Sequence, residues 1–84
     1  MITLKHIEIY RKYCGDGDGF IRCATKEEKT IMDYKDWSLI DTLVEDLSLI
    51  KKGLVSTSFI KLTEERLKEN SDSKETVEAI KDIA

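Results

Sequence analysis

Apolar residues recur at helical spacing along most of this 84-residue chain. Four stretches gather their apolar side chains on one side, which predicts a helix with one buried face in each. These stretches are residues 3–14, 36–52, a third that begins at Ser56 or Thr57 and is broken by Asn70 and Ser71, and 72–84. A shorter helix is expected from about residue 26 to residue 33. We therefore predict an all-α fold, with residues 1–84 forming a single helical domain, a small bundle of four to five helices.

Glycines and helix-capping residues mark the boundaries between these stretches. The chain has no proline and four glycines, and three of the glycines fall at positions 15, 17 and 19. This clustering predicts one irregular Gly/Asp-rich loop at about residues 15–24. Thr25 with Glu28, and Asp72 with Glu75, have the spacing of capping boxes, so each pair is expected to begin a helix.

The stretch 36–52 carries the clearest amphipathic pattern, with Asp36 as its expected cap. Its buried face is expected to hold Trp37, Ile40, Leu43, Val44, Leu47 and Ile50. Leu49 falls instead among polar neighbours, and Leu39 and Ile50 lie near the edge of the apolar face. Small proteins often bury extra apolar surface by self-association. Leu39, Leu49 and Ile50 are therefore candidates for a homodimer interface.

Composition and charge narrow the class of protein. Hydrophobic residues make up 40 % of the chain and charged residues 37 %, with a net charge of −3. This balance is too apolar for a disordered tail and too polar for a membrane protein. No apolar run is long enough to span a bilayer, and the first residues lack the pattern of a signal peptide. Nucleic-acid binding needs a concentrated basic stripe, which is not present. We expect a soluble, cytoplasmic protein that binds neither nucleic acid nor membranes.

Residues with catalytic or metal-binding chemistry are few. His6 is the only histidine, and Cys14 and Cys23 are the only cysteines. A zinc site needs four such ligands, so no metal site is expected. We expect both thiols to be reduced and to pack as small buried hydrophobes, and His6 to pack at the edge of an apolar face. Because no nucleophile motif is present, we predict a non-enzymatic protein with no catalytic residue and no cofactor.

The segment Gly-Asp-Gly-Asp-Gly-Phe-Ile, which follows the first predicted helix, resembles part of an EF-hand calcium loop. In the matching register, Asp16 and Asp18 occupy ligand positions. The same register puts Cys14 and Thr25 where the family has its strongest carboxylate ligands. One interpretation is therefore a small-ligand or calcium-binding module centred on the Gly15–Phe20 loop.

The other interpretation is a rigid turn that presents its charges to another protein. Phe20 and Ile21 would anchor this turn in the core, and its aspartates would face a cationic partner. Nearby aromatic and arginine residues favour a protein interface. The candidate partner-binding residues are Tyr10, Tyr13, Asp16, Asp18, Arg22 and Trp37. By analogy, an immunity-like or antitoxin-like inhibitor of an unidentified protein has this size and acidity.

The order of motifs resembles that of short bacterial proteins of unassigned function, which are often carried as accessory or mobile-cassette genes. The shared features are a tyrosine-containing first helix, Gly-Asp-x-Asp-Gly-aromatic at residues 15–20, Thr-Lys-Glu-Glu at residues 25–28, and a helix with tryptophan at residue 37. This resemblance implies a bacterial, cytoplasmic accessory protein. It implies no activity and gives no residue a role.

Overall fold

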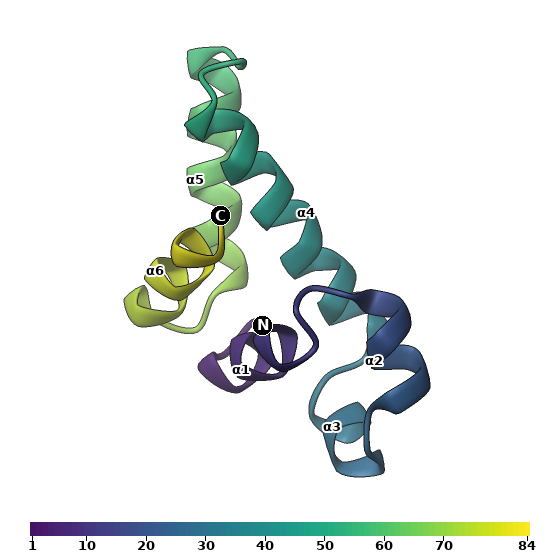
Figure 1. Cartoon of the computed structure of the whole chain (residues 1–84). Coiled ribbons are helices and arrows are strands. Elements are labelled where there is room, and N and C mark those ends of the chain that lie inside the picture. The colour runs from purple at the N-terminus through teal and green to yellow at the C-terminus, as the bar shows by residue number, and fades with distance from the viewer.

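The computed structural model describes residues 1–84 and contains six helices and no strand (Figure 1). The helices are α1 (Leu4–Lys12), α2 (Gly17–Cys23), α3 (Lys26–Ile31), α4 (Tyr34–Lys51), α5 (Thr57–Asn70) and α6 (Lys74–Ile83). The predicted all-α fold is confirmed. The structure has one helix more than the four to five expected, because α2 lies within the predicted loop.

The helix α2 corrects the prediction of an irregular loop at residues 15–24. Asp16 begins it, and its side chain accepts a hydrogen bond from the backbone N–H of Asp18 at 3.1 Å. Phe20 is only 2 % exposed, and its burial offsets the low helix propensity of the neighbouring glycines. Gly17 permits close packing, because a Cβ atom there would lie 3.1 Å from Nε1 of Trp37. Tertiary packing therefore outweighs the local preference for a loop.

Side-chain caps begin the next two helices. Thr25 and Glu28 form the capping box predicted for α3. A second capping box begins α4, where Asp33 is the N-cap and Asp36 its partner. Asp36 was the predicted cap, so the helix begins earlier than expected. The reason is that Asp36 is the N3 residue of the box rather than its N-cap.

The helix α6 begins one residue later than the sequence indicates. Its N-cap is Ser73, whose hydroxyl accepts a hydrogen bond from the backbone N–H of Thr76 at 3.2 Å. Asp72, the predicted cap, accepts a hydrogen bond from the Thr76 hydroxyl instead. Both contacts hold Thr76 in a fully buried position at the start of the helix.

The core lies where α1, α4 and α6 meet, while α2 packs on the N-terminal part of α4 and α5 runs beside its C-terminal part (Figure 1). Its buried apolar residues are Ile2, Ile7, Ile9, Tyr10, Phe20, Met32, Trp37, Ile40, Leu43, Leu47, Leu67 and Ile80. Four of the six residues predicted for the buried face of α4 are among them; Val44 and Ile50 are half-buried.

The N-terminal segment is attached to the turn between α5 and α6. The backbone N–H of Ile2 donates to the carbonyl oxygen of Asn70 at 2.6 Å, and the carbonyl oxygen of Ile2 accepts from the N–H of Asp72 at 3.0 Å. The Ile2 side chain is fully buried. This pairing joins the first residues of the chain to its last two helices.

The molecule is elongated, with dimensions of 41 × 23 × 18 Å. The helices α4 and α5 form an antiparallel hairpin, and its loop end, at the top of Figure 1, stands away from the other helices. No helix combines the length and the apolar content that crossing a membrane requires.

Candidate functional site

Four aromatic rings cluster between α1, α2 and α4. The ring centroid of Trp37 lies 4.9 Å from that of Phe20, 4.7 Å from that of Tyr10 and 6.4 Å from that of Tyr13. Tyr10 and Trp37, predicted to face a partner, are only 5 % and 2 % exposed and belong to the core. The rings are buried because α1, α2 and α4 all pack around them. The apolar pattern of a single helix does not show how many other helices will cover that helix.

The hydroxyl group of Tyr10 has a specific partner at the edge of the core. It donates a hydrogen bond to Oδ1 of Asp41 at 2.8 Å. Burial, and then the hydrogen bond and negative charge of Asp41, raise the pKa of Tyr10 well above its usual range. Tyr10 therefore stays a neutral donor and links α1 to α4.

The charged candidates Asp16, Asp18 and Arg22 remain on the surface, at or on α2. Asp18 and Arg22 lie one helical turn apart and form an ion pair of 3.6 Å. Asp16 acts as the N-cap of α2, so its carboxylate already accepts a backbone hydrogen bond. The helix replaces the loop on which the calcium interpretation depends. No group of three or more His, Cys, Asp and Glu side chains lies close enough together to hold a metal ion.

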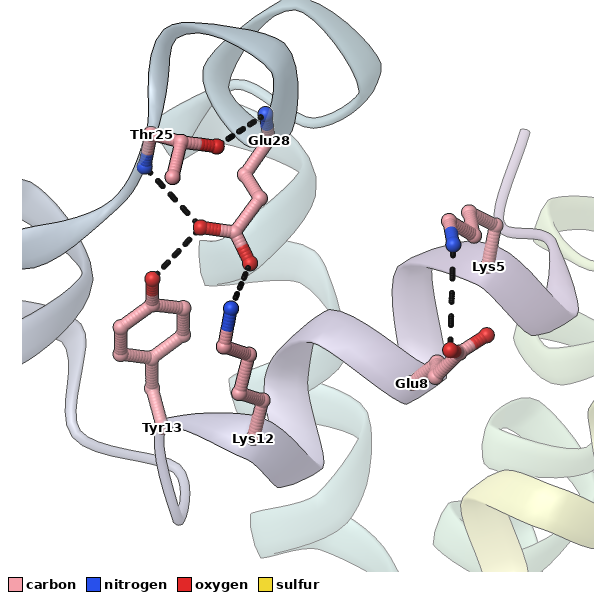
Figure 2. Close-up of polar contacts among 6 residues, drawn as sticks. All are labelled: Lys5, Glu8, Lys12, Tyr13, Thr25 and Glu28. Atoms are coloured by element: carbon pink, nitrogen blue, oxygen red, sulfur yellow. Dashed lines mark hydrogen bonds and ion pairs between the residues drawn. The ribbon is translucent and has the colours of Figure 1, made fainter.

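The densest polar contacts of the structure surround Glu28, between α1 and α3 (Figure 2). Its Oε2 atom accepts a hydrogen bond from Nζ of Lys12 at 2.9 Å. Its Oε1 atom accepts from the hydroxyl of Tyr13 at 2.6 Å and from the backbone N–H of Thr25 at 2.9 Å. The bonds from Lys12, Tyr13 and Thr25 lower the pKa of Glu28 to about 2. The same carboxylate raises the pKa of both Lys12 and Tyr13.

A hollow of about 470 Å³ opens beside Glu28 and is lined on its α1 side by Lys5, Glu8 and Lys12. Lys5 and Glu8 are exposed and 3.7 Å apart, a loose ion pair that contributes little. The carboxylate of Glu28 is fully engaged by its own chain. We therefore interpret these contacts as a polar link that holds α3 against α1, because no residue of α3 is buried.

His6 makes a second link between the same helices. Its Nδ1 atom accepts a hydrogen bond from the backbone N–H of Thr3 at 3.0 Å, and Nε2 lies 2.9 Å from the carbonyl oxygen of Ile31. These partners place the ring proton on Nε2, since a carbonyl oxygen only accepts. His6 is 8 % exposed and packs at the edge of the apolar face.

A smaller and more apolar hollow lies where α2, α3 and α4 meet. It has a volume of about 260 Å³ and is lined by Phe20, Ile21, Lys29, Met32, Asp33 and Tyr34; we call it the Tyr34 hollow. Tyr34 is 53 % exposed and Ile21 50 %. The sequence places Ile21 in the core, and the structure corrects this, because α2 turns Phe20 inward and the next residue outward.

One cation, Lys29, and one carboxylate, Asp33, line the Tyr34 hollow, and the segment of chain that supplies the lining has an excess of negative charge. Residues 15–41 contain seven carboxylates and four cationic side chains. Asp33, on the hollow itself, accepts a hydrogen bond from the backbone N–H of Asp36, and this bond lowers the pKa of Asp33. The side chain therefore carries its full charge at neutral pH. No signal within a single helix would have found this hollow, because its lining comes from three elements.

The predicted dimer residues are not equivalent in the structure. Leu39 and Ile50 are half-buried and pack against the core of their own chain. Leu49 is half-buried but lies outside that core. Of the three, only Leu49 does not pack against the core of its own chain.

Cys14 and Cys23 are free thiols and are exposed, not buried as expected. Cys14 has a positive φ of 52° and lies in the turn after α1, which ends at Lys12, so it is not on the helix face where the sequence pattern placed it. Cys23 is the last residue of α2.

Comparisons of the chain with protein-family models, with curated proteins and with solved structures found no match. Function is therefore inferred from the surfaces of the molecule described above. Of these, the Glu28 contacts serve the fold, and the Tyr34 hollow exposes apolar side chains to solvent.

Proposed function

We propose that the protein is a non-enzymatic interaction module that binds a basic segment of another protein at the Tyr34 hollow. The observation that carries this proposal is the exposure of Ile21 and Tyr34, each about half exposed, at the edge of an apolar hollow. Because Ile21 and Tyr34 line the same hollow, they form one apolar patch, and a partner that covers it removes this apolar surface from water.

The shape of the hollow suits an apolar anchor of a partner. Its volume of about 260 Å³ accommodates one large side chain. Partner side chains that fill such pockets contribute most of the affinity in protein interfaces, and tyrosine is enriched at these positions. We therefore assign Tyr34 and Ile21 as the central contacts and the surrounding polar residues as the rim.

The floor of the hollow is rigid. Phe20 and Met32 are 2 % and 0 % exposed, and the Phe20 ring stacks on Trp37 at a centroid distance of 4.9 Å. A site whose floor is fixed by the core loses little conformational entropy on binding. This supports recognition by a preformed surface over binding that requires folding.

The charge around the hollow supports a cationic partner. The excess of carboxylates over residues 15–41 includes Asp16, Asp18 and Asp33, which are exposed. A negative surface raises the association rate of basic segments and disfavours acidic ones. An inhibitor or accessory protein acts by binding alone, and this arrangement suits such a role.

Selection from a phage-displayed library of random peptides tests this proposal directly. We expect the enriched peptides to share one large apolar residue flanked by Lys or Arg. Binding should weaken about tenfold for Tyr34→Ala and for Ile21→Ala. The control Leu62→Ala, on the far end of the molecule, should bind as the unchanged protein does. Enriched peptides without basic residues, or binding that survives Tyr34→Ala, would refute the proposal.

A further inference from the structure

The loop end of the α4–α5 hairpin, residues 48–62, has an unusual composition for a surface. Seven of its fifteen residues are apolar, and none of the fifteen is buried. Leu54 is 72 % exposed and Leu62 54 %. Every buried residue of α4 and α5 lies closer to the rest of the molecule, from Trp37 to Leu47 and from Thr63 to Leu67. We call residues 48–62 the hairpin end.

Leu54, Ile60 and Leu62 of the hairpin end are exposed, and Val55 and Phe59 are half-buried. Phe59 and Leu62 are three residues apart on α5, so they form one stripe along that helix, and Val55 lies in the turn just before it. Arg66 continues the stripe and pairs with Asp46 of α4 at 3.3 Å. This ion pair shows that α4 lies next to the stripe at Arg66. Leu49, one turn beyond Asp46, extends it.

No other helix of the chain covers this stripe. The contact of α5 with the end of α6 includes the ion pair of Glu64 with Lys81, at 3.4 Å. At 100° per residue, Leu62 points about 160° away from Glu64 around the α5 axis. The stripe therefore faces away from α6, and Figure 1 shows the hairpin end projecting beyond the remaining helices.

The charges of the hairpin are divided along its length. Residues 47–63 contain three lysines, Lys51, Lys52 and Lys61, and no acidic residue. The adjoining part, residues 44–46 and 64–70, contains five carboxylates and two cationic side chains. A second copy placed antiparallel beside the first would set each basic end against the other copy's acidic part. Such a two-fold arrangement is the commonest symmetry of protein dimers.

We propose that the hairpin end is a homodimer interface, in which the α4–α5 hairpins of two copies pack antiparallel as a four-helix bundle. A two-fold axis close to Leu62 brings the two Leu62 side chains together. It also sets Lys61 of each copy within reach of Glu65 of the second copy; both side chains are exposed and neither forms an ion pair within its own chain. Four helices enclose apolar faces that two helices leave in water.

Analytical ultracentrifugation over a wide range of protein concentration tests this dimer. We expect a monomer–dimer equilibrium, and Leu62→Glu should raise the dimer Kd at least about tenfold. The matched control is Ile21→Glu, because Ile21 is 50 % exposed but lies at the Tyr34 hollow; it should leave the dimer Kd unchanged. Circular dichroism confirms that both variants keep their helices. A strictly monomeric unchanged protein at the highest concentration overturns the proposal.

A charge exchange distinguishes the antiparallel arrangement from other contacts. Lys61→Glu and Glu65→Lys should each weaken the dimer, and an equimolar mixture of the two variants should restore it, because every contact then joins opposite charges. Failure of the mixture to restore dimerisation overturns the two-fold arrangement. A basic and apolar end also suits an anionic membrane surface. Flotation of a monomeric protein with phosphatidylglycerol vesicles would therefore overturn the dimer and identify a lipid surface as the occupant.

Discussion

The helix α3 and the hairpin end both lack a buried residue, yet they are stabilised in different ways. α3 is polar, and long-range hydrogen bonds from His6, Lys12 and Tyr13 hold it against α1. The hairpin end is apolar; Ile50 packs against the core at its base, and Lys51 donates one hydrogen bond to the carbonyl oxygen of Ala84 at 3.2 Å. An element without buried residues can therefore be either a polar segment held by hydrogen bonds or an apolar segment that is still exposed. For α3 the fold supplies polar partners on α1, whereas the hairpin end has apolar surface left for another molecule.

The largest test of this comparison is at Met32, which follows α3 directly and is fully buried. Met32→Ala removes the apolar anchor at one end of α3 and leaves a cavity. We expect a loss of about 2–5 kcal/mol in the free energy of unfolding, measured by urea denaturation. The matched change at the hairpin end, Leu54→Ala, should stay within about 0.5 kcal/mol, because Leu54 is 72 % exposed. Equal losses would show that the hairpin end is packed within the monomer.

The next test removes the histidine link. His6→Ala leaves the carbonyl oxygen of Ile31 and the N–H of Thr3 without their side-chain partner, at a cost of about 1–3 kcal/mol. Hydrogen exchange should speed up in α3 and in the first turn of α1, and the amides of α5 should change least. The exposed neighbour Lys5, changed to Ala, is the control. Uniform faster exchange along the chain would contradict a local role for His6.

The pH dependence of stability tests the other link. The pKa of Glu28 is lowered from the usual 4.5 to about 2, so the folded state prefers its charged form. The stabilisation is complete above about pH 4.5 and is lost progressively as the pH falls towards 2. Glu28→Gln removes this contribution, so the free energy of unfolding should fall less steeply with acidification over that range. Glu8→Gln, at a carboxylate that is 72 % exposed, is the control. An unchanged slope in Glu28→Gln would refute this link.

The sequence predicts contacts between residues that are close along the chain, but not contacts between separate helices. The capping box of Thr25 and Glu28 was predicted, because it depends on residues three apart. The contacts of Glu28 with Lys12 and Tyr13 were not, because they join separate helices. The same limit applies to Trp37: its position on an apolar face was predicted, but not its complete coverage by α1 and α2.

The glycine-rich segment was misjudged for the opposite reason. Glycine at positions 15, 17 and 19 favours a loop locally, and only the burial of Phe20 against Trp37 makes residues 17–23 helical. That helix turns Ile21 outward and creates the Tyr34 hollow. The candidate site therefore depends on a tertiary contact that has no signature in local spacing. Of the residues predicted to bind a partner, the charged ones on and beside α2 are exposed and the aromatic ones mainly serve the core.

The smallest expected effect, and the one that bears most directly on the hairpin end, is the dependence of thermal stability on protein concentration. A dimer stabilises the folded state by mass action, so the Tm of the unchanged protein should rise as its concentration increases. Leu62→Ala should have nearly the same Tm as the unchanged protein in dilute solution, because Leu62 is 54 % exposed in the monomer. At high concentration its Tm should be lower by a few degrees, since it gains less from association. Differential scanning calorimetry at several concentrations measures both values. A Tm difference that is the same at every concentration would mean that Leu62 acts within one chain, and the hairpin end would then resemble α3 in being satisfied by its own fold.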